Sequence, residues 1–283
     1  MKVKLFYVVF LFIVISCKQS DITSQSLESK ILTSKTILFD QQIDGNMISR
    51  PVIIETSSGI DDQKSYPIVI ALHGRGGSNT NWVQPLSGFT NSGEFIGVYP
   101  QGYLNSWNLG QEPSNANDAA FISIIIDTLL SYSNVDESKI FAVGISNGSG
   151  MVNVLGSFNK RLKAIAPISS QLTERTEIKT NSIPLSVFQV NGGQDLTIPI
   201  DGGIKLGHPF LSVSESAKKW ATNFNCNQNI AVEETEQTIL HTYSDCDNSV
   251  VVKYLIVKGA GHNIARVYSS IWNDVWNFFR TLD

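Results

Sequence analysis

The chain has 283 residues, of which 42% are hydrophobic and 16% charged, and it includes 14 Phe and 5 Trp. This is enough apolar material for one large core, and α/β folds of this size often form a single domain. The formal net charge is −4, and it becomes −6 (−4 − 2) if Lys2 and Lys4 leave with an N-terminal leader. Such an acidic chain is not expected to bind nucleic acid or an anionic membrane surface. No Cys/His spacing indicates a metal site, and we predict no cofactor.

Residues 1–16 are typical of a lipoprotein signal peptide, because two lysines precede an apolar run too short to span a membrane comfortably. The run ends in Val-Ile-Ser-Cys, which resembles the bacterial lipobox and predicts lipidation of Cys17. The alternative is an ordinary cleaved leader with a chance cysteine. Residues 17–35 are polar and unpatterned, as in a flexible tether. We therefore expect a folded domain over residues 36–283, lipid-anchored in the bacterial cell envelope (outer membrane or periplasm) or secreted, with no other membrane contact.

Strand-like and helix-like segments alternate along this domain. Apolar or β-branched runs predict strands at residues 36–39, 47–55, 65–72, 95–99, 140–143, 162–168, 184–190 and 250–257. The first two are expected to be antiparallel edge strands, and residues 230–244 form an antiparallel-looking excursion before the last strand. Amphipathic patterns predict helices at residues 116–132, 213–223 and 264–282. The alternation indicates an α/β fold with a mostly parallel sheet covered by helices on both faces.

A Gly-x-Ser-x-Gly pattern at residues 144–148 follows a buried strand and precedes a helix-like stretch. A serine on such a sharp turn has its Oγ pushed out of the sheet on strained backbone. Gly144 and Gly148 leave room where a Cβ would collide with neighbouring backbone. The pattern by itself is equally consistent with a glycine-rich turn and an incidental serine. Ser146 is therefore a candidate nucleophile whose partners must be found elsewhere in the chain.

A nucleophilic serine needs a general base, and in α/β-hydrolases the histidine follows the serine in the chain. Three histidines do so, His208, His241 and His262. His241 lies in an alternating strand pattern, and His208 lies in a Gly-rich loop where it could line a pocket. His262 follows the last predicted strand and a Gly-rich turn, so it can reach over the carboxyl edge of the sheet toward Ser146. We predict that His262 is the base.

The residue that orients the base should follow the strand between the serine and the histidine. The strand at 184–190 leads into a turn that ends in Asp195. Asp201, in the next Gly-rich turn, is the competitor, and its alternative role is to hydrogen-bond backbone in that turn. We favour Asp195, which would fix the tautomer of His262 and stabilise the imidazolium formed during the reaction.

The oxyanion that forms in acyl transfer needs hydrogen-bond donors near the serine. The strand before His73 ends in a His-Gly-rich turn, which supplies such a backbone N–H in α/β-hydrolases. Arg75 is the preferred donor, with Gly74 and Gly76 as neighbours one step away, and the N–H of Asn147 is the second donor. A phosphate-binding loop is the alternative, but the Gly-Lys-Ser/Thr ending is missing. His73 precedes the serine and is expected to pack beneath the loop.

Together these segments resemble the secreted α/β-hydrolases grouped around polyhydroxybutyrate depolymerases and feruloyl or acetylxylan esterases. The matching pieces lie between about residue 42 and the end of the chain, at residues 72–74, 99–102, 106–108, 118–122, 144–151, 195–203 and 259–262 and at the cysteine pair. The resemblance implies an α/β-hydrolase catalytic domain and an esterase with Ser146, Asp195 and His262 as its triad. Arg75 departs from the pattern, since depolymerase-like members usually have cysteine there.

Two cysteines remain if Cys17 carries lipid, and an exported protein encounters an oxidising compartment. We therefore expect Cys226 and Cys246 to form a disulfide that closes a loop of about 20 residues around the antiparallel excursion. Two free buried thiols are the alternative.

The loop at residues 100–115 is rich in turn formers but carries Tyr103 and Trp107. Loops at the carboxyl ends of strands build binding clefts, so both aromatics are predicted to contact substrate, with a purely structural Trp107 as the alternative. The predicted function is a serine esterase that removes feruloyl or acetyl groups from plant polysaccharides through an acyl-enzyme, on polysaccharide or small ester substrates. The alternatives are a polyhydroxybutyrate-type depolymerase, a serine peptidase on the same fold, and a non-catalytic glycan-binding protein.

Overall fold

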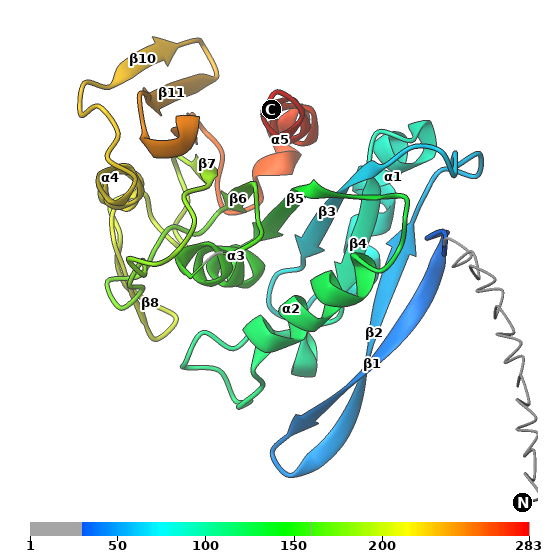
Figure 1. Ribbon diagram of the computed structural model, residues 1–283. Helices are drawn as coiled ribbons and strands as arrows, with labels where there is room; N and C mark the ends of the chain where they lie inside the picture. The colour runs from blue at the N-terminus through cyan, green and yellow to red at the C-terminus, as the bar shows by residue number, and fades with distance from the viewer. Residues whose placement is uncertain (1–29, 159, 283) are drawn as a thin grey trace, which may run out of the picture.

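A computed structural model describes residues 30–158 and 160–282 (Figure 1). The predicted leader, Cys17 and most of the predicted tether lie outside these residues. Leu32 is fully buried, and its backbone N–H and C=O both hydrogen-bond to the side chain of Asn134, at 2.8 and 3.0 Å. The folded domain therefore extends back at least to Leu32, ahead of the boundary predicted at residue 36.

The centre of the fold is a twisted ten-stranded sheet within the described residues. In spatial order its strands are β1 (Lys35–Ile43), β2 (Asn46–Glu55), β4 (Ile96–Pro100), β3 (Tyr66–Leu72), β5 (Val135–Ile145), β6 (Ala164–Ile168), β7 (Ser186–Gly192), β12 (Val252–Val257), β11 (Thr238–Tyr243) and β10 (Ala231–Glu234). Strands from β4 to β12 run parallel, whereas β1, β2, β11 and β10 join antiparallel at the two edges. The prediction of a mostly parallel sheet is confirmed.

Helices cover both faces of this sheet (Figure 1). One apolar cluster joins the sheet to α2 (Asp118–Leu129), α3 (Asn147–Ser157) and α4 (Val213–Asn223), and a second joins it to α1 (Val83–Ser92) and α5 (Ile271–Arg280). Side chains along β3 alternate between the two clusters, with Ile68, Ile70 and Leu72 in the first and Val69 and Ala71 in the second, as the two-residue period of a strand requires. None of the described helices is long and apolar enough to cross a membrane.

The C-terminal helix begins later than predicted. The pattern at residues 264–282 predicted one continuous helix, but Ile264–Arg266 forms a short 3₁₀ turn and α5 starts only at Ile271. Ile264 and Ile271 are both buried, whereas Val267 between them is exposed, so the chain reaches the core at both ends of this segment without a continuous helical stripe. The predicted helix at 116–132 is also shorter, because Asn117 caps α2 through the N–H of Ala120.

Two further elements carry no clear periodic signal in the sequence. These are α1 and the hairpin formed by β8 (Gly203–Lys205) and β9 (His208–Phe210), which follows the turn after β7. The helix predicted at 213–223 matches α4, whose capping box pairs the Ser212 side chain with the Glu215 N–H at 3.2 Å. The prediction from the amphipathic pattern is therefore confirmed, and the capping box fixes the start of the helix.

Cys226 and Cys246 are joined by a disulfide, 20 residues apart in the chain. Cys226 follows the C-terminus of α4 and is buried. Backbone hydrogen bonds from Asn227 N–H to the Ser244 carbonyl (2.9 Å) and from Asp247 N–H to the Phe224 carbonyl (2.8 Å) flank the bridge. The disulfide therefore closes the loop that carries β10 and β11.

Because of this bridge, unreduced material from an oxidising compartment should show no alkylation at Cys226 or Cys246 by peptide mass spectrometry. Both should become reactive after reduction. Replacing both by Ser should lower the free energy of unfolding by about 3 kcal/mol, because the open loop gains entropy in the unfolded chain. Two reactive thiols without reductant would contradict the bridge.

Candidate active site

Ser146 lies on a strained turn between β5 and α3. Its backbone has φ 53° and ψ −119°, in the left-handed region where a non-glycine residue costs about 1–3 kcal/mol. A Cβ on Gly144 would stand 2.4 Å from the Gly148 carbonyl oxygen, and one on Gly148 would stand 2.3 Å from the Leu72 carbonyl oxygen. Only glycine fits at either position, so the elbow packs directly against the end of β3.

A chain of hydrogen bonds runs from Ser146 through His262 to Asp195. The Ser146 Oγ lies 2.8 Å from His262 Nε2, and His262 Nδ1 lies 2.7 Å from Asp195 Oδ2. The other carboxylate oxygen of Asp195 accepts from the N–H groups of Thr197 (2.8 Å) and Ile198 (3.0 Å), and the side chain is fully buried. An ionised carboxylate in this position fixes the proton on Nδ1 and leaves Nε2 free to accept the serine proton.

The competing sequence candidates lie elsewhere. Asp201 is exposed in the turn before β8. His241 on β11 stacks on Tyr254 with ring centroids 4.1 Å apart, and His208 on β9 is buried against Glu112. Within the described residues, none of the three has a hydrogen bond to the serine or to its histidine partner. The structure thus brings together the three residues favoured from the sequence.

Ser169 is a residue that sequence reasoning missed. It follows β6 with φ 58°, its Oγ donates to the His262 carbonyl at 2.8 Å, and its N–H donates to the Val190 carbonyl at 2.8 Å. The side chain therefore holds the backbone of the histidine loop. The only sequence signal is that a serine pair follows an apolar strand at the carboxyl edge of the sheet.

Backbone N–H groups in both segments that flank Ser146 lack an acceptor among the described residues. They include those of Gly74 and Arg75 in the loop after β3 and that of Asn147 at the first position of α3. Gly76 is engaged, because its N–H donates to the Asn105 carbonyl at 2.7 Å. Of the two neighbours considered from the sequence, Gly76 is therefore unavailable, and Gly74 stays an alternative to Arg75 as the donor opposite Asn147.

Trp107 is fully buried, so its predicted contact with substrate is wrong. Its backbone N–H donates to Asn147 Oδ1 at 2.7 Å, and its carbonyl accepts from Asn147 Nδ2 at 2.9 Å. Its indole N–H donates to the His73 carbonyl at 2.8 Å. These bonds tie the loop between β4 and α2 to both the elbow and the loop after β3. Tyr103, in the short 3₁₀ turn Tyr103–Asn105, is half-buried and stays a candidate rim residue.

A buried ion pair fixes this loop from beneath. Arg50 Nη2 lies 2.7 Å from Asp118 Oδ1, with 2% and 0% of the side chains exposed. Arg50 also donates to the Gln101 carbonyl through Nε and Nη2, and Asp118 Oδ2 accepts from the Asn108 N–H at 2.7 Å. The pair thus holds two points of the loop that contacts Asn147.

His73 serves structure rather than acid–base chemistry. Its Nδ1 donates to the Gly74 carbonyl at 2.8 Å, and its Nε2 accepts from the Gly102 N–H at 3.0 Å. Burial lowers the pKa of His73 below its ordinary value, which keeps the ring neutral, as these bonds need. The expectation that His73 packs beneath the loop therefore matches the structure.

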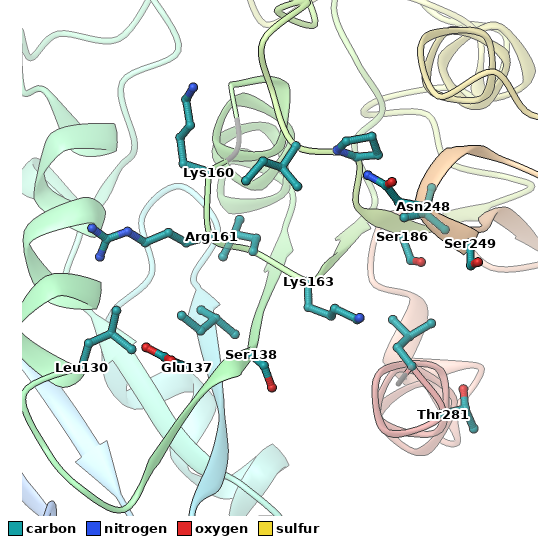
Figure 2. Close-up of a pocket in the computed structure, with 16 residues that line it drawn as sticks. Leu130, Glu137, Ser138, Lys160, Arg161, Lys163, Ser186, Asn248, Ser249 and Thr281 are labelled. Carbon is teal, nitrogen blue, oxygen red and sulfur yellow. The ribbon is translucent and has the colours of Figure 1, made fainter.

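An apolar pocket of about 250 Å³ opens beside Ser146 and His262. Its hydrophobic walls come from β5, β6 and the segment after His262, namely Ile145, Ile168, Ile264, Ala265, Ile271 and Trp272. A cavity of about 720 Å³ lies at the opposite, amino-terminal end of the strands, where Ser138, Lys163 and Ser186 line it (Figure 2). The smaller pocket is the one placed to receive a group bonded to Ser146. The described residues include no His, Cys, Asp and Glu group able to hold a metal ion.

Comparison with known proteins finds esterases. Feruloyl esterase B of Piromyces equi is 27% identical over 229 residues, which are 75% of this chain and 42% of that protein. A probable feruloyl esterase C of Aspergillus clavatus is 28% identical over 81% of this chain and 83% of its own length. The chain spans 42% to 62% of the length of three of the curated relatives it matches. No protein-family profile matches the chain.

The solved structure of an acetyl xylan esterase from Aspergillus awamori superposes with a TM-score of 0.59 at 14% identity, over 86% of this chain and 99% of that one. At this identity the likeness concerns the fold alone. It agrees with the mostly parallel sheet and the covering helices.

The hydrogen-bond geometry separates the two candidate aspartates in a testable way. Asp195→Asn should lower kcat for an activated ester by about 10⁴, because the amide favours the wrong histidine tautomer. Asp201→Asn, a matched change on an exposed residue, should leave kcat within about threefold, as surface changes usually do. The opposite ranking would move the role to Asp201.

Proposed function

We propose that this chain, an α/β-hydrolase with feruloyl esterases among its relatives, is a serine esterase that cleaves carboxylic esters through an acyl-enzyme on Ser146. The observation that carries the proposal is the continuous hydrogen-bond chain from Ser146 through His262 to the buried Asp195, beside an apolar pocket. The similarity to enzymes named feruloyl esterases supports the reaction class.

In the first half-reaction the Ser146 Oγ attacks the ester carbonyl carbon while His262 Nε2 takes its proton. The carbonyl oxygen becomes an oxyanion and accepts hydrogen bonds from the N–H groups of Arg75 and Asn147. The intermediate then collapses, the C–O bond to the alcohol breaks, and His262 returns its proton to that oxygen. Asp195 stabilises the imidazolium throughout, and Ser146 is left acylated.

In the second half-reaction water replaces the alcohol. His262 removes a proton from the water as its oxygen attacks the acyl carbonyl, and the same two N–H groups bind the second oxyanion. Collapse releases the carboxylic acid and returns the proton to Ser146. The positive charge on His262 exists only around the tetrahedral states, so the buried carboxylate of Asp195 acts mainly there.

The acyl group in this proposal is aromatic, and feruloyl fits better than acetyl. The pocket at Ser146 is lined mainly by aliphatic side chains and by Trp272, a half-buried residue whose ring meets Trp82 edge-on with centroids 5.1 Å apart. An acetyl group is too small to cover most of the apolar wall of a pocket of about 250 Å³. The alcohol is a sugar of a plant-type polysaccharide, the substrate class of the related enzymes named acetylxylan and feruloyl esterases.

The proposal places the enzyme outside the cytoplasm. The disulfide between Cys226 and Cys246 supports this, because such bonds persist in oxidising compartments. The lipid anchor at Cys17 stays a prediction that labelling of the full chain with a radioactive or alkyne fatty acid would test, with Cys17→Ser as the unlabelled control.

The nucleophile is tested by Ser146→Ala. The substitution removes the attacking oxygen and should lower kcat on p-nitrophenyl acetate by about 10⁶. The substitution removes one hydrogen bond, to His262 Nε2, so the melting temperature should stay near that of the wild type. Retention of more than a few per cent of the activity would show that another residue attacks the ester.

The acyl specificity is tested by Trp272→Ala. The loss of an aromatic wall should lower kcat/KM on methyl ferulate by about 10-fold or more but on p-nitrophenyl acetate by less than about threefold. Tyr103→Ala is the matched control on the other candidate aromatic. Equal losses on both esters would make Trp272 structural, and a larger selective loss with Tyr103→Ala would move the aromatic contact there. Turnover of hydroxybutyrate oligomers or of peptide amides in place of ferulate would contradict the substrate.

A further inference from the structure

Glu112 is a buried acidic side chain for which the reaction above has no use. It is the only charged residue between Pro100 and Asn117, and 1% of its side chain is exposed. One carboxylate oxygen, Oε2, accepts from the backbone N–H groups of Leu109 at 2.6 Å and Gln111 at 3.2 Å. These two bonds shape its own loop and leave the second oxygen for other partners.

The second oxygen, Oε1, faces three elements that are distant in the sequence. Arg75 Nη2 donates to it at 2.9 Å, His208 Nε2 lies at 3.2 Å, and Asn147 Nδ2 lies at 3.4 Å. Arg75 and Asn147 are the two residues whose backbone N–H groups are assigned to the oxyanion. One carboxylate oxygen therefore touches both halves of the proposed oxyanion hole.

The carboxylate is ionised at neutral pH. Burial raises the pKa of Glu112, but the N–H groups of Leu109 and Gln111, together with His208, outweigh it, and the pKa lies below its ordinary value. An uncompensated anion beside a forming oxyanion would oppose the reaction. The guanidinium of Arg75, which is 46% exposed, supplies the compensating charge.

We propose that Glu112 is a positioning residue of the oxyanion hole, which holds the Arg75 loop and the Asn147 side chain at a fixed separation so that their N–H groups converge on one point. Arg75 has two roles in this arrangement, a backbone donor for the oxyanion and a side chain that anchors the loop and neutralises the carboxylate. The inference rests on the esterase function proposed above.

A positioning role and a purely structural role can be told apart by the complexes that each affects. The oxyanion hole is filled in the tetrahedral state but not by the free acid product, so misplaced donors weaken only the former. Phenylboronic acid forms a tetrahedral adduct with a nucleophilic serine and places an oxygen in the hole, whereas ferulate binds as a planar acid. The ratio of the two inhibition constants therefore reports on the hole itself.

The first experiment compares wild type with Glu112→Gln, a nearly isosteric change that weakens the anchor to Arg75. We expect kcat on p-nitrophenyl acetate to fall by about 10- to 100-fold, a part of the loss that removal of a whole donor causes. Affinity for phenylboronic acid should fall in parallel, while KM and the inhibition constant of ferulate change by less than about twofold. Glu236→Gln, on an exposed residue between β10 and β11, is the matched control.

The second experiment uses Arg75→Met, which keeps the backbone N–H and removes a side chain that is 46% exposed, with the melting temperature measured as the check on folding. Its kcat should also fall, because the buried carboxylate then lacks its partner. If Glu112 acts through Arg75, the kcat of the double variant should be no lower than that of the less active single variant.

The outcomes separate the inference from the function on which it rests. Wild-type kcat in Glu112→Gln or in Arg75→Met, or losses that multiply in the double variant, would overturn the positioning role while the esterase stands. A wild-type protein that phenylboronic acid does not inhibit and that hydrolyses no ester would instead remove the proposed function. If Glu112→Gln does not fold, Arg75→Met alone decides, through its kcat and its boronic acid affinity.

Discussion

The buried ion pair between Arg50 and Asp118 is the interaction on which the arrangement of the site depends. Its two side chains hydrogen-bond to the loop between β4 and α2, Arg50 to the Gln101 carbonyl and Asp118 to the Asn108 N–H. Removing one partner of a buried pair typically costs about 3–5 kcal/mol, because the other charge is left without compensation. The loop fixed in this way presents Trp107 to the elbow and Glu112 to the oxyanion loop, so an irregular segment behaves as a rigid part of the scaffold.

The elbow stores backbone strain that this scaffold must overcome. Ser146 has a positive φ, and the glycines on either side of it admit neighbouring backbone at distances that no Cβ tolerates. The strain places the Oγ clear of the sheet, where His262 can reach it from a loop that Ser169 holds. The loops after β5, β7 and β12 thereby meet at Ser146, and the end of β6 holds two of them, through the Ile168 carbonyl and the Ser169 side chain.

The sequence allowed prediction of the residues whose roles follow from local pattern and chain order. Ser146, Asp195 and His262 each follow a recognisable strand, and the parallel order of those strands brings their ends together. The roles of residues that depend on tertiary contacts could not be predicted from the sequence. Trp107 was predicted to contact substrate because its loop follows the carboxyl end of a strand, but its indole and backbone hydrogen bonds lie in the interior. The roles of Glu112 and Trp272 depend on contacts with residues that are distant in the sequence, such as Arg75 for Glu112 and Ser146 for Trp272.

The central claim is that Ser146 carries the acyl group during turnover. The most direct measurement is peptide mass spectrometry of the protein after reaction with a fluorophosphonate, which reacts covalently with a serine activated by a neighbouring base. The account predicts one adduct, on the peptide that contains Ser146, and its loss when His262 is replaced by Ala. An adduct on another serine, or ester hydrolysis that continues undiminished in the fluorophosphonate-treated protein, would contradict the account.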